Sequence, residues 1–305
     1  MTWHALATYR RDGTNRAAIV VGEAIHDLDA VAALHAPALL GRGVDALIAD
    51  WENAAPAVAA LADAVRDRVG GEGCVACADL AVPFTPRRVF GAASNYIEHA
   101  EEMQTKLAAK ADSEPYIFLK TVESVIGPDE TVVIPPQVER PDWEVELGVV
   151  IGRAGRAIDA AQAFDHIAGY TVVNDVSARD KTRRSDFPFS HDWFRGKSFD
   201  TFTPVGPWFV PRDCLGDPHD IRLGLRVNDE AMQDGNTSEM IFDCFEQIAY
   251  LSTILELKAG DLIATGTPAG VGMGRGVFLR DGDVMTAWVD GIGELRNPVR
   301  AVAAG

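Results

Sequence analysis

The chain has 305 residues, of which 47% are hydrophobic and 24% charged, and its formal net charge is −17. This length fits one large domain, or a large domain with a smaller companion, and the composition is that of a folded protein. The negative charge argues against a nucleic acid partner, because binding to phosphates needs clustered Lys and Arg. The sequence has no apolar stretch of about 20 residues and no secretory pattern, so we expect a cytoplasmic protein that does not span a membrane.

Residues 1–80 are predicted to form a small N-terminal α+β accessory domain. Strand-like runs at residues 3–11, 16–22 and 24–28 are separated by turn signals, and an Ala-rich helical pattern extends from Val44 to Val69. Pro56 interrupts this pattern, and we expect it to break or kink the helix.

The chain contains four cysteines, of which Cys74 and Cys77 form one C-x-x-C in a Gly-rich stretch. A zinc site needs about four ligands, and no second C-x-x-C or H-x-x-x-H follows. We therefore expect reduced thiols without a metal or redox role.

Residues 81–305 are predicted to form the larger domain. Ten short strand-like runs dominate it, from RRVFGAAS near residue 88 to ELRNPV near residue 296, whereas helical patterns cover only Tyr96–Ala111, Ala160–Ile167 and Glu239–Ile254. The expected fold class is mainly β (α+β), with a mixed or antiparallel β core and peripheral helices.

Three acidic residues in apolar surroundings are candidate metal ligands. Glu144 and Glu146 lie two apart in WEVELGVVIG, and the period of a strand places both carboxylates on one face. Such a pair in an apolar, central strand either faces water or shares a cation, because burying it alone is costly. Asp175 follows a second β-rich run and is either a third ligand or a turn residue. Oxygen ligands favour Mg²⁺, with Mn²⁺ or Ca²⁺ as alternatives, over zinc.

Five strings, in this order, resemble the fumarylacetoacetate hydrolase family: GAASNYIEHAEEM, DWEVELGVVIG, NDVSARD, RGKSFDTFTPVGP and LIATGTPAGVG. The resemblance covers roughly residues 85–300. It implies a mixed β-sandwich roll, a homodimer, and Mg²⁺ held by Glu144, Glu146 and Asp175.

His99 and Glu102 are candidates for a catalytic dyad. On a helix, their spacing of three places them on one face, where a carboxylate can orient the ring so that its other nitrogen accepts a proton. The alternative is a solvated surface pair. The resemblance favours the dyad, since family members carry it in an NYxxHxxE motif on a lid.

Lys197, Arg179 and Thr267 are further candidates. Lys197 would stabilise an enolate or carboxylate oxygen beside the cation, and Arg179 would clamp a substrate carboxylate; both could instead form surface ion pairs. Thr267 and the nearby amides of TGTPAGVG have a shape suited to a carboxylate, although any turn needs Gly and Pro.

The segment after SARD departs from the family pattern. Relatives often carry a Gln soon after this string, whereas this chain reads DKTRRSDFPFSHDWF. Recognition of the distal end of the substrate could therefore involve Arg183, Arg184 or His191, and the sequence does not choose among them.

The predicted activity is hydrolytic C–C cleavage of a 2,4-dioxo acid of acylpyruvate or fumarylpyruvate type, through an enolate that the cation binds. Two alternatives stay open. The same site could serve an oxaloacetate-type decarboxylase or a hydroxymuconate-type isomerase or decarboxylase, or the acids could bind a structural Ca²⁺ in a protein that is not an enzyme.

Overall fold

The computed structural model describes residues 2–66, 73–75 and 79–303. The N-terminal elements are β1 (His4–Arg11), β2 (Thr14–Val21), β3 (Ala24–Asp27), α1 (Leu28–His35), α2 (Val44–Ala49), α3 (Trp51–Val65) and β4 (Asp79–Ala81). The three strand predictions are confirmed. Cys77 lies outside the described residues, while Cys74, Cys214 and Cys244 are free.

The prediction that Pro56 breaks the Ala-rich helix is wrong. The pattern divides at Asp50, between α2 and α3, and Pro56 lies inside α3. Pro56 is exposed, so water can replace the hydrogen bond that its missing N–H removes.

A long mixed sheet forms the centre of the molecule. Its strand order is β3-β2-β1-β13-β11-β10-β16-β5-β6, with β4 beside β1 and β7 beside β13. The remaining members are β5 (Arg88–Ala93), β6 (Tyr116–Lys120), β7 (Val125–Ile126), β10 (Val145–Ile151), β11 (Ile167–Asn174), β13 (Thr203–Pro211) and β16 (Asp261–Ala264). Strand β10 pairs with β11 and β16, so it is central, as its apolar sequence predicts.

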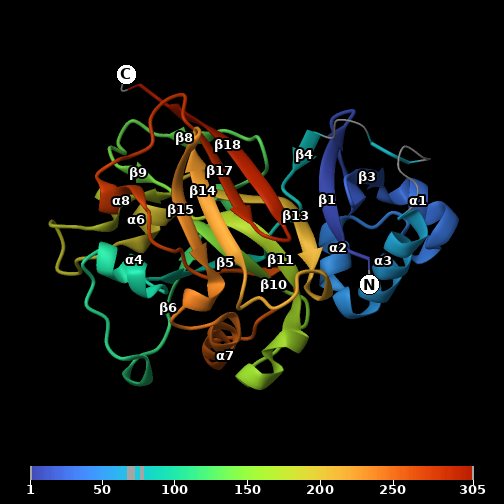
Figure 1. Ribbon diagram of the computed structural model, residues 1–305, viewed down its shortest axis with the longest axis horizontal. Helices are drawn as coiled ribbons and strands as arrows, with labels where there is room; N and C mark the ends of the chain where they lie inside the picture. Colours follow the sequence, from blue (N-terminus) through green and yellow to red (C-terminus); the bar gives the residue numbers. More distant parts are fainter. Residues whose placement is uncertain (1, 67–72, 76–78, 304–305) are drawn as a thin grey trace.

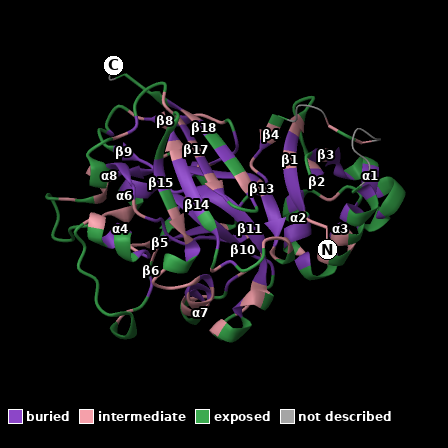
Figure 2. Cartoon of the chain, viewed as in Figure 1, coloured by how far each residue is buried: buried purple, intermediate pink, exposed green. Residues whose placement is uncertain are grey.

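A second sheet packs on the first. Its order is β15-β14-β17-β18-β8, formed by β14 (Arg222–Val227), β15 (Glu230–Asn236), β17 (Val284–Val289), β18 (Gly293–Ala301) and β8 (Val132–Ile134). Alternate β10 residues such as Leu147 pack against Leu225 and Ala287 of this sheet, whereas Val150 packs on the side of the N-terminal helices. Figure 2 shows these central strands as the buried interior. The result is a β-sandwich with a mixed sheet, and the predicted fold class is confirmed.

Helices lie at the periphery and are shorter than their sequence patterns. They include α4 (Ile97–Glu102), α5 (Arg179–Thr182), α6 (Trp193–Lys197), α7 (Cys244–Ile254) and α8 (Gly272–Arg275). The helix predicted over Tyr96–Ala111 ends at Glu102, shortly before Gln104 adopts a φ of 54°. The pattern at Ala160–Ile167 forms a 3-10 helix over Ala160–His166, and that at Glu239–Ile254 begins only at Cys244.

The two predicted domains share one sheet, because Leu6 of β1 pairs with Phe209 of β13. In Figure 1, α4, α6 and α8 lie at the end of the strand-rich part that is remote from the N-terminal helices. The boundary between the two domains near residue 80 stays a prediction.

No helix of the described residues is long and apolar enough to cross a membrane.

Candidate metal and catalytic site

Glu144, Glu146 and Asp175 converge at the end of the central strands. Each offers a carboxylate oxygen, these oxygens lie within 4.8 Å of one another, and all three residues are buried. Glu144 immediately precedes β10, Glu146 lies on it, and Asp175 immediately follows the neighbouring strand β11. The amide of Asp175 donates to the carbonyl of Glu144 at 2.8 Å, which ties the two strand ends together.

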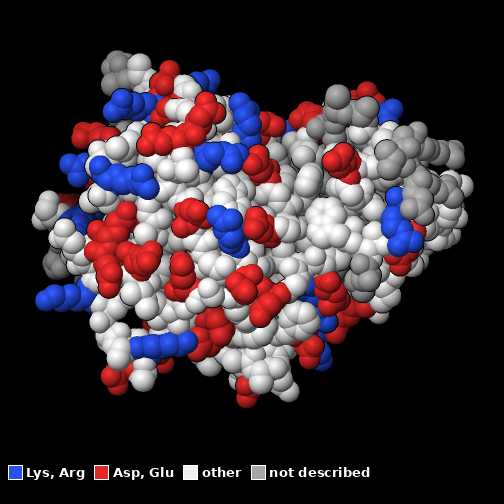
Figure 3. Space-filling model, in the orientation of Figure 1, with Lys and Arg blue, Asp and Glu red and all other residues white. Residues whose placement is uncertain are grey.

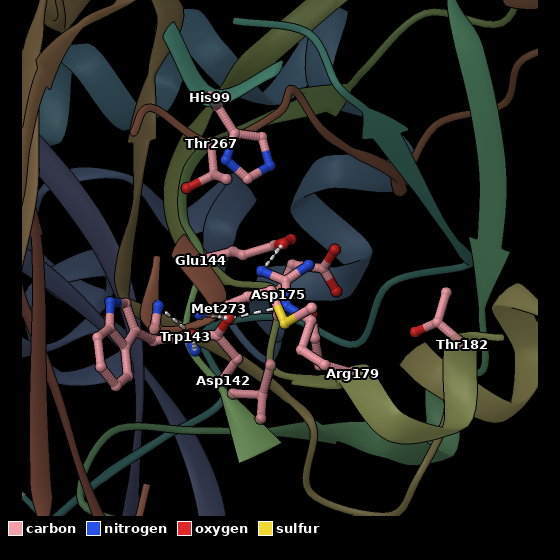
Figure 4. A network of polar contacts seen from close by, with 12 residues as sticks. His99, Asp142, Trp143, Glu144, Asp175, Arg179, Thr182, Thr267 and Met273 are labelled. Carbon is pink, nitrogen blue, oxygen red and sulfur yellow. Dashed lines mark hydrogen bonds and ion pairs between the residues drawn. The ribbon is translucent and has the colours of Figure 1, made fainter. Parts of the chain in front are cut away.

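Three basic side chains surround two of these carboxylates. The Lys197 ammonium lies 2.5 Å from both Glu144 and Asp175, and Lys120 also donates to Asp175. Arg179 lies 2.6 Å from Glu144 through Nη2 and donates from Nε to Asp142 at 2.7 Å, as Figure 4 shows. Burial disfavours the charged form of Glu144, but Arg179 and Lys197 prevail and lower its pKa well below the ordinary value.

Glu146 differs from its neighbours because no basic side chain of the described residues forms an ion pair with it. Its carboxylate accepts from the Gly266 amide at 2.8 Å. Burial, together with the charges of Asp175 and Glu144, raises its pKa well above the ordinary value. A cation between the three groups would remove this repulsion, and an all-oxygen donor set suits Mg²⁺, Mn²⁺ or Ca²⁺. The residues therefore fit a hard divalent cation.

His99, which is buried, and Glu102, which is partly exposed, form a pair on α4. The His99 Nδ1 atom lies 3.6 Å from the Glu102 carboxylate, so the two must approach slightly to form a hydrogen bond. Burial opposes ionisation of Glu102, but His99 and the Gly270 amide together lower its pKa. His99 lines the same cavity as Glu144 and Lys197, and Figure 4 places it beside Thr267 on the opposite side of Glu144 from Asp142.

The Gly/Pro-rich loop after β16 provides backbone amides, as predicted, but they bind the protein's own carboxylates. Gly266 donates to Glu146, Gly270 to Glu102 at 3.1 Å, and Gly272 to Asp142 at 2.6 Å. The amides of this one segment thus fix the positions of three carboxylates relative to one another: Glu146 of the metal site, Glu102 of the dyad, and Asp142, the partner of Arg179.

Thr267 is also held by protein groups. Its hydroxyl donates to the Val145 carbonyl at 2.8 Å and accepts from the side-chain amide of Gln233 at 2.8 Å. Thr267 and Arg179 both line the cavity, so their contact with substrate stays a prediction.

The site opens into one cavity of about 980 Å³. Glu144, Lys197, His99 and Thr267 line it, together with residues of β6, of the start of α6 and of the segment after α5. The cavity therefore brings Glu144 of the carboxylate triad and both residues of the dyad to one open space.

The family model "Fumarylacetoacetate (FAA) hydrolase C-terminal" matches residues 88–300. The chain belongs to the fumarylacetoacetate hydrolase family. Human oxaloacetate tautomerase FAHD2A, a mitochondrial protein, is 43% identical over 216 residues, which are 70% of this chain and 67% of the relative. An uncharacterised protein of Pyrococcus abyssi is 45% identical over 71% of this chain and 91% of its own length.

Solved structures of the family share nearly the whole fold. A fumarylacetoacetate hydrolase from Exiguobacterium antarcticum has a TM-score of 0.79 at 31% identity, covering 98% of this chain and 100% of that one. Maleylpyruvate hydrolase from Sphingobium sp. SYK-6, solved with manganese(II) and pyruvate, has a TM-score of 0.73 at 28% identity, covering 97% and 99%.

Lys120, Asp142 and Gln233 are site residues that our sequence reasoning missed. All three are buried and polar, and each contacts a candidate site residue or the strand that carries it. A lysine ending the apolar run PYIFLK, and an Asp two positions before the E-x-E pair, were the available signals. In this member of the family, they hold the predicted site in place.

Proposed function

We propose that the protein hydrolyses a C–C bond of a 2,4-dioxo acid of acylpyruvate or fumarylpyruvate type. The observation that carries this proposal is the His99–Glu102 pair, which lines one cavity with Lys197 and with Glu144 of the carboxylate triad. A base and a cation site on one cavity, with a lysine against two of the carboxylates, have the parts that such a hydrolysis needs.

His99 acts as the general base. Glu102 orients the ring through Nδ1, so that Nε2 accepts a proton from water as the water oxygen attacks the carbonyl distal to the 2-oxo acid. The bond between this carbonyl carbon and C3 of the substrate then breaks, and its electron pair becomes the enolate of pyruvate. His99 returns the proton to C3, which gives pyruvate and a carboxylic acid.

Glu144, Glu146 and Asp175 would hold the divalent cation. When bound, the cation supplies chelation of the 2-oxo acid end and stabilisation of negative charge on its oxygens. Lys197 lies against two of these carboxylates and offers its ammonium to the same developing charge. Asp142 and Arg179 fix the position of Glu144 from the other side.

Keto–enol tautomerisation of a 2-oxo dicarboxylic acid is the second candidate. It is favoured by the 43% identity to a human oxaloacetate tautomerase over 216 residues. In this reaction His99 would move a proton between C3 and solvent, and no water would attack. Decarboxylation of such acids at the same site also needs no attacking water.

We also propose that the protein assembles as a homodimer.

The deciding experiment assays acetylpyruvate, fumarylpyruvate, oxaloacetate and a hydroxymuconate analogue with Mg²⁺ or Mn²⁺ and with chelator. We expect cleavage of a dioxo acid that chelator abolishes, and a loss of about 100-fold or more in kcat for His99→Ala. Tautomerisation without cleavage, or cleavage that His99→Ala leaves unchanged, would refute the hydrolytic mechanism. Glu146→Gln should abolish metal binding, measured by calorimetry with Mn²⁺, while the fold is retained.

A further inference from the structure

Two buried amide side chains are connected to the metal site through one peptide group. Asn95, between β5 and α4, is 3% exposed, and Gln247, on α7, is fully buried. Acidic and basic side chains are interspersed over the surface that Figure 3 shows, whereas these two interior groups are neutral. Neither lines the cavity, so an effect on the site must pass through other residues of the protein.

Asn95 uses both ends of its side-chain amide. Its Nδ2 atom donates to the carbonyl oxygens of Phe242 and Thr265, each at 2.8 Å, and its Oδ1 atom accepts from the Phe242 amide at 2.9 Å. The backbone carbonyl of Asn95 also accepts from the Ile241 amide at 2.7 Å. Asn95 thus ties the start of α4 to the segment before α7 and to the residue that follows β16.

The peptide between Thr265 and Gly266 connects Asn95 to the metal site. Its carbonyl accepts from Asn95, and its N–H donates to the Glu146 carboxylate at 2.8 Å. The C=O and N–H of a trans peptide point in opposite directions, so the amide, the peptide and the carboxylate form one chain of hydrogen bonds. Hydrogen bonds arranged in this way polarise one another, and the bond from Asn95 therefore strengthens the N–H as a donor to Glu146.

Gly266 brings this peptide close to Asn95. Its φ is 103°, in a region that favours glycine, and a methyl group at position 266 would stand 2.7 Å from Cβ of Asn95. The Glu146 carboxylate depends on this arrangement, because the Gly266 N–H is its one hydrogen-bond donor among the described residues. Asn95 therefore acts on the acid of the triad that has the fewest partners of its own.

Gln247 supports the same peptide but leaves one of its own atoms unsatisfied. Its Nε2 atom donates to the carbonyls of Thr265 at 3.2 Å and Phe242 at 3.0 Å, the two that Asn95 also binds. Its Oε1 atom is buried and has no hydrogen-bond partner in the part of the chain that the structure describes. A buried acceptor without a partner destabilises the fold, so stability alone does not explain a glutamine here. The donor group that it directs at the peptide does.

We infer that Asn95 is a positioning residue for the cation site and that Gln247 assists it. The two amides hold the Thr265–Gly266 peptide in the orientation in which its N–H fixes the Glu146 carboxylate. This inference rests on the proposed cation site and extends it to residues that contact neither the ion nor the substrate.

Calorimetry with Mn²⁺ tests this role without turnover. Asn95→Ala should weaken Mn²⁺ binding by about 10- to 100-fold, as for other groups that orient metal ligands. Asn297→Ala is the matched control, because Asn297 is also buried and its Nδ2 atom donates to two backbone carbonyls, at 2.8 and 2.9 Å, without lining the cavity. Each variant loses one buried amide, so urea should unfold both at similarly lowered concentrations, whereas Asn297→Ala should keep the Mn²⁺ affinity of the unmodified protein. Equal Mn²⁺ affinities for the two variants would overturn the inference.

Gln247→Leu keeps the test decisive if Asn95→Ala does not fold. It removes the unsatisfied Oε1 atom together with the donor, so we expect a folded protein. Mn²⁺ affinity should fall by about 2- to 10-fold, the change that corresponds to one net hydrogen bond. An affinity equal to that of the unmodified protein would contradict the inference.

The unmodified protein separates failure of this inference from failure of the proposed function. If it binds no Mn²⁺, the proposed cation site is wrong, and the inference falls with it. If it binds Mn²⁺ and Glu146→Gln abolishes binding, the cation site stands, and unchanged binding by Asn95→Ala refutes only the role of Asn95.

Discussion

Gly274 lies directly against Glu102: a methyl group at position 274 would stand 2.3 Å from the Glu102 side chain, far inside van der Waals contact. The glycine is on α8, and Glu102 is on α4 beside His99. Because position 274 has no side chain, the Glu102 carboxylate can occupy this space. A larger residue at position 274 would therefore shift Glu102 and, through it, the ring of His99.

Gly274→Ala should displace Glu102 and misalign His99. We expect kcat to fall by about 10- to 100-fold, because general base catalysis depends on the geometry of the pair. Mn²⁺ affinity, measured by calorimetry, should be unchanged, since the carboxylate triad is not touched. Gly43→Ala is the control, because a methyl group there meets open space and its φ of −71° suits any residue. An unaltered kcat in Gly274→Ala would show that Glu102 does not orient His99.

Asp142 supports the metal site through Arg179. Its carboxylate accepts from Arg179 and from the amides of Gly272 and Met273, and it is fully buried. Asp142→Asn keeps the size but removes the charge that holds Arg179. We expect Mn²⁺ affinity to fall by about 10- to 100-fold, as for other groups that orient metal ligands.

The same change should lower the free energy of unfolding by about 3–5 kcal/mol. It removes the negative charge of a buried ion pair and leaves the Arg179 charge without its Asp142 partner. Urea denaturation of the metal-free protein measures this. Asp234→Asn is the control: its pair with Arg222 at 2.9 Å is exposed, so its loss should cost less than about 1 kcal/mol. If both variants behave alike, the Asp142–Arg179 pair does not support the site.

The strands and the shared face of Glu144 and Glu146 could be predicted because their signals are local, whereas the position of Asp175 beside this pair was implied only by the resemblance to the family. Apolar runs mark β10 and β11, and the period of two places Glu144 and Glu146 on one face. Strand β15 was missed because AMQDGN lacks alternating apolar residues; its pairing depends on the neighbouring strand β14. The start of α7 could have been read from the sequence, since Asp243 and Glu246 form a capping box. Our prediction instead began the helix at Glu239.

The partners of the acids could not be predicted because they lie far away in the chain. Lys120 contacts Asp175 across 55 positions, and Gly266 contacts Glu146 across 120. Helix α4 was predicted too long because the charged residues after Glu102 continue the helical pattern, whereas the chain turns at Gln104. Tertiary contacts, which no local pattern encodes, decide these points.

His26 should make the folded state sensitive to mild acid. It lies on β3, only 1% of its surface is exposed, and neither ring nitrogen has a hydrogen-bond partner among the described residues. Burial lowers the pKa of His26 from 6.5. Between this lowered pKa and 6.5 the unfolded chain binds a proton that the folded chain does not, so stability falls as pH decreases.

We expect His26 to lower the free energy of unfolding by at most about 1.4 kcal/mol for each pH unit below 6.5, until the folded-state pKa is reached. His26→Leu, which places an apolar side chain in the same buried position, should flatten this dependence in urea denaturation between pH 7.5 and 5.5. His35→Gln, a change at an exposed histidine of α1, is the control and should keep the slope of the unmodified protein. Identical slopes for all three proteins would show that His26 takes up a proton in the folded state as readily as in the unfolded chain, and that its burial has no effect on acid stability.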